Sequence, residues 1–190
     1  MTPAKEAGYY DKVFSTSAKY AAHPTKTPYV KLWARAIELL DNPPLIVDLG
    51  CGPGQFAQML CESGYDGIYI GFDFSPVAIE KARKRVAGER CYFATQDLRT
   101  ARLGNRSAVF LCLETLEHLD DDLELLRKIP VGAKVIFSVP NFGDAAHVRK
   151  FDNEQAIQER YGDLMTFHTE IITPPFNSAS VIFLSEGTRT

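Results

Sequence analysis

The chain has 190 residues, of which 45% are hydrophobic, and its formal net charge is −3. This length suits one domain with a sizeable core, and the negative charge gives no indication of a polyanionic partner. The spacing of the four cysteines excludes a C-x-x-C zinc or redox motif, so we predict reduced thiols of a cytoplasmic protein. No apolar run is long enough to span a bilayer, and we expect no membrane partner.

The first 41 residues precede the first predicted strand and are rich in tyrosine. Apolar side chains at helical spacing predict a helix over residues 30–40, which ends before the sequence Asn42-Pro43-Pro44. Two interpretations are open for the tyrosines before and beside this helix: ordinary packing, or a lid whose ring faces attract a cationic ligand. We favour the lid, formed by Tyr9, Tyr10, Tyr20 and Tyr29.

Residues 45–54, LIVDLGCGPG, combine a short apolar run, an acid and three alternating glycines. The pattern predicts a buried strand over residues 45–49, a tight turn and a helix that begins at Gln55. Glycine suits backbone that takes positive φ or approaches a ligand closely. The helix start offers free N–H groups and a partial positive charge, so the turn should receive an anionic group.

A second predicted strand, residues 69–74, contains Asp73, which lies 19 residues after Gly54. A carboxylate at this distance can accept both hydroxyls of a ribose, as it does in dinucleotide sites; the alternative is an aspartate that caps a helix. Phe74, the next residue, would lie against the adenine of such a nucleoside. Ser75 and Pro76 predict the start of a helix, whose basic run over residues 81–85 should face solvent.

The rest of the chain continues to alternate between strand and helix patterns. Strands are predicted over 91–98, 107–113 and 134–139, a helix after Asp120, a partly helical insert over 144–160, and a closing strand pair at 165–172 and 180–184, separated by Pro174-Pro175 and Asn177. Continuous apolar strands with interspersed helices predict an α/β fold with a doubly wound, mostly parallel sheet and helices on both faces.

The string V-D-L-G-C-G-P-G at residues 47–54 resembles motif I of the class I S-adenosylmethionine (SAM) methyltransferases, and the likeness extends over about residues 30–186. The resemblance implies a Rossmann-like, seven-stranded sheet with an antiparallel last strand, and SAM as cofactor with S-adenosylhomocysteine as product. It also implies one methyltransferase domain over residues 1–190: a helical cap at 1–41 and a core at 42–190, with a substrate-side insert at 141–162.

The same resemblance implies a set of cofactor contacts. The glycine turn would approach the amino-acid part of SAM, Asp73 the ribose, and Asp97 with Leu98 the adenine. The full predicted cofactor set is Asp48, Gly50, Cys51, Gly52, Gly54, Asp73, Phe74, Gln96, Asp97, Leu98, Leu113 and Tyr20.

The segment Glu114-x-x-Glu117-His118 is similar to the E-x-x-E-H element of small-RNA 3′-terminal 2′-O-methyltransferases and of ubiquinone-biosynthesis O-methyltransferases. In the RNA enzymes these side chains, with a later histidine, hold a divalent metal. His147 would be that histidine here, but its surroundings differ from those of the RNA family, and the same string occurs in methyltransferases without a metal. We therefore predict no metal, and keep a site of Glu114, Glu117, His118 and His147 as the alternative.

Methyl transfer requires an aligned nucleophile and removal of its proton when it carries one. His118 is the predicted base, because its ordinary pKa suits proton transfer near neutrality, and Glu114 is the second predicted catalytic residue. The predicted substrate contacts are Tyr9, Tyr10, His147, Arg149 and His168.

The function predicted from these residues is methyl transfer from SAM to oxygen or nitrogen of a small molecule. The enzyme would be a monomer or homodimer without a nucleic-acid partner. Three alternatives stay open: a metal-assisted O-methyltransferase acting on a diol, a catechol or an RNA 3′ end; a non-catalytic SAM-binding subunit of a larger assembly; and, more remotely, a nicotinamide-dependent oxidoreductase with an altered glycine turn.

Overall fold

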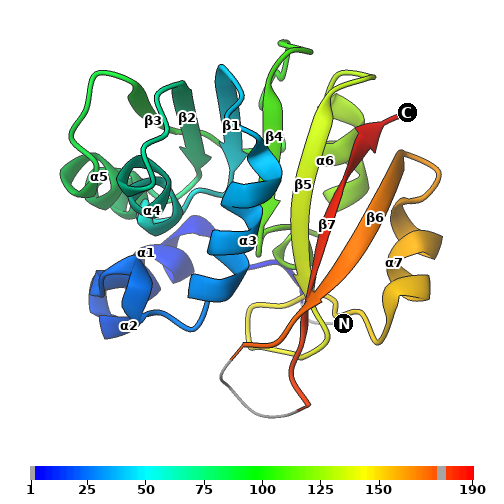
Figure 1. The fold of residues 1–190 in the computed structure, drawn as a ribbon. Helices are drawn as coiled ribbons and strands as arrows, with labels where there is room; N and C mark the ends of the chain where they lie inside the picture. Colours follow the sequence, from blue (N-terminus) through cyan, green and yellow to red (C-terminus); the bar gives the residue numbers. More distant parts are fainter. Residues whose placement is uncertain (1–2, 175–178) are drawn as a thin grey trace.

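The computed structural model describes residues 3–174 and 179–190, so Pro175 and Asn177 of the predicted connection lie outside the described residues. Seven strands form one sheet in the order β3-β2-β1-β4-β5-β7-β6 (Figure 1). Their bounds are β1 Leu45–Leu49, β2 Ile68–Asp73, β3 Cys91–Thr95, β4 Val109–Leu113, β5 Lys134–Pro140, β6 Met165–Ile172 and β7 Ile182–Arg189. Only β7 runs antiparallel to its neighbours β5 and β6, so the predicted fold class is confirmed.

Helices cover both faces of the sheet. Their bounds are α1 Ala7–Thr16, α2 Ala18–Ala21, α3 Val30–Leu40, α4 Gln55–Glu62, α5 Pro76–Arg85, α6 Asp122–Lys128 and α7 Glu154–Tyr161, with 3₁₀ turns η1 Pro24–Lys26 and η2 Leu116–His118. The apolar sides of α3, α4 and α5 pack in one core, and those of α6 and α7 in a second core. None of the helices in the described part of the chain is long and apolar enough to cross a bilayer.

The two cores explain why the central strands are apolar throughout. In β1, Ile46 joins the first core and Val47 the second; in β5, Ile136 and Phe137 divide in the same way. Successive side chains of a strand point to opposite faces, so a strand covered on both faces needs apolar residues at every position.

The structure differs from the predicted boundaries where side chains close local turns. The third strand ends at Thr95, because the Asp97 carboxylate accepts the backbone N–H of Arg99 and starts a turn. In the same way, Asn105 accepts the N–H of Ser107, and β4 begins only at Val109. The insert after β5 divides in two: residues 142–147 reach the cavity described below, whereas α7 packs on the second face of the sheet.

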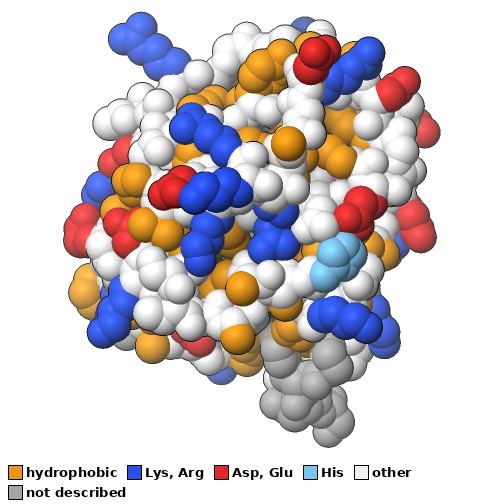
Figure 2. All heavy atoms as spheres, turned by 90° about the vertical axis from the view of Figure 1, so that its left-hand side faces the viewer, with side chains coloured by type: hydrophobic (Ala, Val, Ile, Leu, Met, Phe, Trp, Pro, Cys, Tyr) orange, Lys and Arg blue, Asp and Glu red, His pale blue; other side chains and the backbone are white. Residues whose placement is uncertain are grey.

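The N-terminal cap is tied to the core by side chains that bind its backbone carbonyls. Figure 2 shows the side of the molecule that carries α5, where Lys and Arg side chains gather. Arg85 donates to the carbonyls of Tyr20 and Ala22, and Lys81 donates to that of Phe14. The prediction that this basic run simply faces solvent is therefore wrong for these two side chains, because a cap that ends in free carbonyls provides acceptors for them.

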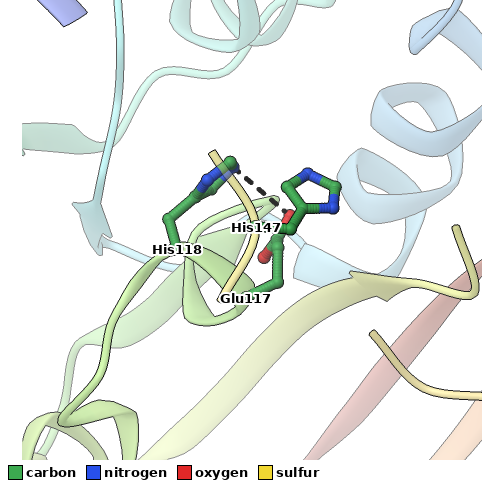
Figure 3. Close-up of side chains that lie close together, drawn as sticks. All are labelled: Glu117, His118 and His147. Carbon is green, nitrogen blue, oxygen red and sulfur yellow. Dashed lines mark ion pairs between the residues drawn. The ribbon is translucent and has the colours of Figure 1, made fainter. Parts of the chain in front are cut away.

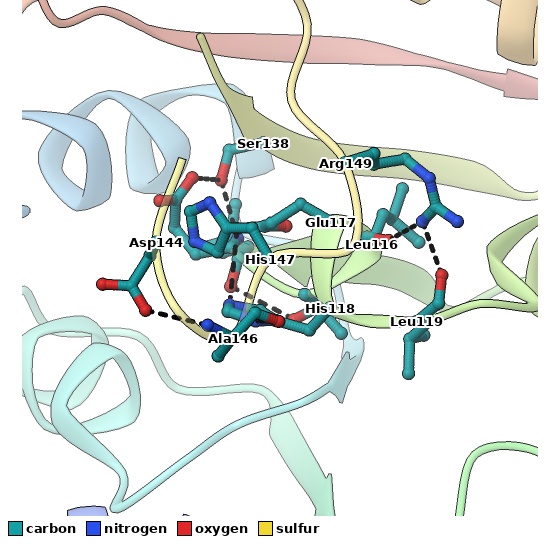
Figure 4. Close-up of polar contacts among 12 residues, drawn as sticks. Leu116, Glu117, His118, Leu119, Ser138, Asp144, Ala146, His147 and Arg149 are labelled. Atoms are coloured by element: carbon teal, nitrogen blue, oxygen red, sulfur yellow. Dashed lines mark hydrogen bonds and ion pairs between the residues drawn. The ribbon is translucent and has the colours of Figure 1, made fainter. Parts of the chain in front are cut away.

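A buried ionic cluster fixes α6 to the segment after β5. The fully buried Asp122 carboxylate accepts from Arg160 at 2.6 and 2.8 Å and from the Tyr161 hydroxyl at 2.8 Å, and it lies 3.1 Å from Arg149. Arg149 also donates to the carbonyl of Leu116 (Figure 4). Asp122, in the first turn of α6, is thus the centre of a buried network.

Replacing Asp122 with alanine should lower the free energy of unfolding by about 3 kcal/mol, because two guanidinium groups lose a buried counter-charge. Urea unfolding at neutral pH measures the change. Asp121→Ala is the matched control, since the Asp121 side chain makes no capping hydrogen bond, and it should change stability by less than about 1 kcal/mol. Equal losses in both variants would contradict this role of Asp122.

Candidate active site

A cavity of about 930 Å³ lies at the carboxyl ends of β1, β2 and β4, beneath α1 and α2. This volume is in the range of sites that enclose a nucleoside-sized ligand. Fifteen of the residues predicted for cofactor, substrate or catalysis line it: Tyr9, Tyr10, Tyr20, Asp48, Gly50, Cys51, Gly52, Asp73, Phe74, Asp97, Leu98, Leu113, Glu114, His118 and His147.

The glycine turn after β1 has the backbone geometry that its sequence predicts. Gly50, Gly52 and Gly54 all have positive φ, at 92°, 52° and 77°. A Cβ on Gly54 would lie 2.9 Å from the Cα of Ala82, and one on Gly50 would lie 2.5 Å from Thr115 Oγ1. The turn therefore needs glycine for its φ angles and also for close packing against α5 and the residues after β4.

Asp73 connects this turn to the end of β2. Its carboxylate accepts the N–H of Gly52 at 3.0 Å and that of Ser75 at 2.9 Å. Burial raises the pKa of Asp73 to about 6, partly offset by these backbone donors. The group is thus ionised near neutrality and lines the cavity, where a diol could replace or share its donors.

Asp48, one strand away, is buried and accepts a hydrogen bond from the Tyr69 hydroxyl. Burial raises the pKa of Asp48 to about 7, although the Tyr69 hydrogen bond acts in the opposite direction. The two strand-end acids thus differ in environment: a phenol satisfies Asp48, and backbone N–H groups satisfy Asp73.

Glu114 stands at the other side of the cavity in a strained backbone conformation, with φ of 53°. Its N–H donates to Ser138 Oγ at 2.8 Å, and the Ser138 hydroxyl donates to Glu114 Oε1 at 2.9 Å (Figure 4). Burial raises the pKa of the Glu114 carboxyl to about 7, while the Ser138 hydrogen bond and the charge of Lys19 act against this rise.

Glu117, His118 and His147 lie together beside the cavity (Figure 3). Their candidate ligand atoms all lie within 4.8 Å of one another. Glu117 is fully buried, and within residues 3–174 and 179–190 neither carboxyl oxygen has a hydrogen-bond partner; His118 Nε2 lies 3.6 Å from Oε1. Burial raises the pKa of Glu117 well above its ordinary value.

The Nδ1 atoms of both histidines are engaged with backbone carbonyls. His118 Nδ1 lies 3.1 Å from the Ala146 oxygen, and His147 Nδ1 lies 3.1 Å from the Phe142 oxygen. The Tyr10 hydroxyl also lies 3.0 Å from His118 Nδ1. A carbonyl can only accept, so the two carbonyl contacts favour the tautomer in which each Nδ1 carries the proton and each Nε2 keeps its lone pair. Burial lowers the pKa of His118 to about 4, and burial also lowers that of His147.

Four predicted site residues do not line the cavity. Gly54 packs on α5, and Gln96 donates to the carbonyl of Asp97 and to Thr100. Arg149 belongs to the Asp122 cluster, and His168 lies on β6 opposite Glu186 of β7. The expected contacts of these four residues with cofactor or substrate therefore stay predictions, and the side chains of Gln96 and Arg149 are held by other partners.

Two cavity-side features were not predicted from the sequence. Lys19 donates to the Tyr29 hydroxyl at 3.0 Å and lies over the rings of Tyr20 and Tyr29, so its ammonium group occupies ring faces expected to attract a cationic ligand. Nothing in the sequence marks this lysine. Ser138 was detectable in principle, since it is the one polar residue in the apolar run of residues 135–139.

Comparison with known proteins agrees with this geometry. Residues 46–130 match the family model described as a methyltransferase domain. Together with the fold, this match supports the predicted resemblance to the class I SAM-dependent methyltransferases, a family that uses SAM as its cofactor.

Among curated proteins, the chain is similar to trans-aconitate 2-methyltransferases of Streptomyces coelicolor, at 26% identity, and Streptomyces avermitilis, at 28% identity. Each alignment covers 82% of this chain, but the chain spans only 55% and 62% of the two relatives. Among solved structures, magnesium protoporphyrin IX methyltransferase from Synechocystis PCC 6803 with bound SAM is similar in fold, with a TM-score of 0.73, 18% identity and full coverage of both chains.

Replacing Asp73 with asparagine should weaken S-adenosylhomocysteine binding roughly 10- to 100-fold, because a charged acceptor of hydrogen bonds from the ribose becomes neutral. Isothermal titration calorimetry measures the affinity, and a thermal melt checks that the variant is folded. Asp163→Asn, at an exposed position after α7, is the control. Unchanged affinity in a folded Asp73→Asn protein would remove the ribose role.

Proposed function

We propose that this chain transfers the methyl group of SAM to a hydroxyl or amine of a small molecule, with Glu114 as the general base. SAM supplies an electrophilic methyl group on a sulfonium; the protein must hold the acceptor in line and take its proton. The observation that supports the proposal is the Glu114 carboxyl, which lines the cavity with a pKa raised by burial to about 7. A base works best when its pKa is near the working pH.

Glu114 suits this role better than His118, which the sequence favoured. The proton on His118 Nδ1 is directed to a carbonyl, and Nε2 faces the buried Glu117. Burial lowers the pKa of His118 to about 4, so the imidazole takes up a proton poorly. Glu114 is held by Ser138 through Oε1, which leaves Oε2 to accept a proton.

The charges of the cavity favour an acceptor without several carboxylates. Eight acidic side chains line the cavity: Glu6, Asp48, Asp73, Asp97, Glu114, Asp120, Asp121 and Asp144. Among the residues that the structure describes, Lys5, Lys19 and Arg99 are the lysines and arginines that line it, and Arg99 is paired with Asp97 at 2.9 Å. The curated relatives are named for trans-aconitate, a polycarboxylate; we propose that this cavity instead accepts a neutral or cationic molecule.

The Glu114→Gln variant should lower kcat/KM at pH 8 by at least about 100-fold, because glutamine can keep the Ser138 hydrogen bond but cannot take a proton. For the unaltered protein, kcat/KM should rise with pH through about 7 and then level off, since the base must be ionised. The variant should lack this rise. Activity is followed as S-adenosylhomocysteine formation with panels of phenols, alcohols and amines, and with trans-aconitate.

Glu154→Gln, in the exposed first turn of α7, is the control and should keep full activity. S-adenosylhomocysteine affinity should be similar in both variants and the unaltered protein. A Glu114→Gln protein with unchanged kcat/KM would exclude Glu114 as the base, and faster turnover of trans-aconitate than of every neutral acceptor would overturn the acceptor class. Binding of S-adenosylhomocysteine without turnover of any acceptor would instead favour a non-catalytic SAM-binding subunit.

A metal-assisted O-methyltransferase is the second candidate, and the unsatisfied Glu117 carboxylate favours it. Two imidazoles and a carboxylate form a ligand set that suits first-row divalent metals. The Nδ1–H···O=C contacts of His118 and His147 are the arrangement that orients metal-binding histidines. A divalent ion held by these three residues would lower the pKa of an acceptor hydroxyl.

The cluster in the structure contains three of the four residues that the sequence offered as an alternative metal site. Glu114 is not a member, because Ser138 holds its carboxyl in a separate contact. The three remaining side chains come from η2 and from the segment after β5, which are joined where Val148 N–H donates to the Glu117 carbonyl at 2.8 Å. Within residues 3–174 and 179–190, the candidate metal ligands are therefore Glu117, His118 and His147.

If this second candidate is correct, Co²⁺ added to the metal-free protein should give visible d–d absorption at one equivalent, and His147→Ala should weaken Co²⁺ binding at least about 10-fold. His168→Ala is the matched control, because His168 lies on β6 away from the cluster. An absence of stoichiometric absorption, or equal affinity in all three proteins, would exclude the metal-assisted mechanism while leaving Glu114 as base.

A further inference from the structure

Two of the four cysteines lie side by side although 30 residues separate them in the chain. Cys61 Sγ and Cys91 Sγ are 3.2 Å apart, and both are free thiols. Cys61 is in the last turn of α4, and Cys91 is the first residue of β3. Both are partly exposed, whereas Cys51 and Cys112 are buried, so only this pair combines proximity with access.

Both thiols are attached to elements that the core holds in place. The last turn of α4 is anchored through Leu60, which is buried in the first core, and Cys91 is in register with Tyr69 of β2, which is also buried there. Little chain ordering is then needed to bring the sulfurs together, and such fixed proximity raises the effective concentration of one group at the other.

The pair also has the chemical asymmetry of a reactive dithiol. A hydrogen bond with Cys91 lowers the pKa of Cys61 to about 7, and the same contact raises the pKa of Cys91. The thiolate is the nucleophilic form of cysteine, so Cys61 would react first. Neither cysteine lines the cavity, and the proposed methyl transfer does not use them.

We propose that Cys61 and Cys91 form an oxidisable dithiol that hydrogen peroxide converts into an intramolecular disulfide. The Cys61 sulfur attacks one peroxide oxygen, the O–O bond breaks, and a sulfenic acid forms with release of water. The Cys91 sulfur then attacks the Cys61 sulfur, the S–O bond breaks, and the second water leaves. In total, two thiols and one hydrogen peroxide give one disulfide and two waters.

The cross-link would join α4 to β3 across β2 and close a loop of the chain between residues 61 and 91. Because a cross-link restricts the unfolded chain, the oxidised protein should melt roughly 5 °C higher than the reduced protein. A thiol reductant should reverse the change.

The test treats the full chain with one equivalent of hydrogen peroxide and maps peptides without reduction. The expected result is a disulfide between Cys61 and Cys91. Cys51 and Cys112 should remain free thiols, which an alkylating reagent labels once the protein is unfolded. In the Cys91→Ser variant, Cys61 should stop at the sulfenic acid and be captured by dimedone. In Cys61→Ser, dimedone capture at position 91 should be at least about 10-fold weaker.

The variants keep the experiment decisive if a single substitution lowers stability, because peptide mapping of the unaltered protein is independent of them. A disulfide that involves Cys51 or Cys112, a linkage only between two molecules, or four unmodified thiols after treatment would overturn the proposal. A melting temperature that does not rise on formation of the Cys61–Cys91 linkage would overturn the stabilising role assigned to it.

Discussion

The structure depends on how the carboxyl ends of β1 and β2 are joined. A single buried carboxylate, that of Asp73, accepts the N–H of Gly52 from one strand–helix turn and the N–H of Ser75 from the next. One carboxylate thus satisfies backbone N–H groups of both turns and fixes the two turns next to each other. The same carboxylate lines the cavity, so the group that organises the turns is also the group available to a ribose.

The glycine turn and Asp73 could be predicted because short stretches of sequence specify their conformation and position. The glycine spacing specifies backbone that other residues adopt only with strain, and Gly50, Gly52 and Gly54 all have positive φ. The apolar strands were equally readable, because a sheet covered on both faces accepts few other residues in its centre. Asp73 follows from its distance to the turn, since parallel strands bring their carboxyl ends to one edge.

The residues on the substrate side of the site could be predicted only in part, because partners distant in sequence determine where their side chains lie. A histidine has an ordinary pKa that suits a base, but His118 is partly buried and its Nδ1 contacts the carbonyl of Ala146, 28 residues away. Arg149 has the charge to hold an acidic substrate, yet the burial of Asp122 directs it into the fold. Such outcomes depend on desolvation and on the position of the partner, neither of which a short motif specifies.

The position of α1 over the cavity has a consequence for ligand release. Tyr10 of α1 contacts the ring of Phe74 on one side and lies 3.0 Å from His118 on the other, and Phe14 is buried behind it. Residues of α1 and α2 line the cavity, so a ligand bound there would contact this aromatic row. If the proposed methyl transfer is correct and α1 must move for the spent cofactor to leave, that movement, and not bond making, would limit turnover when it is slow.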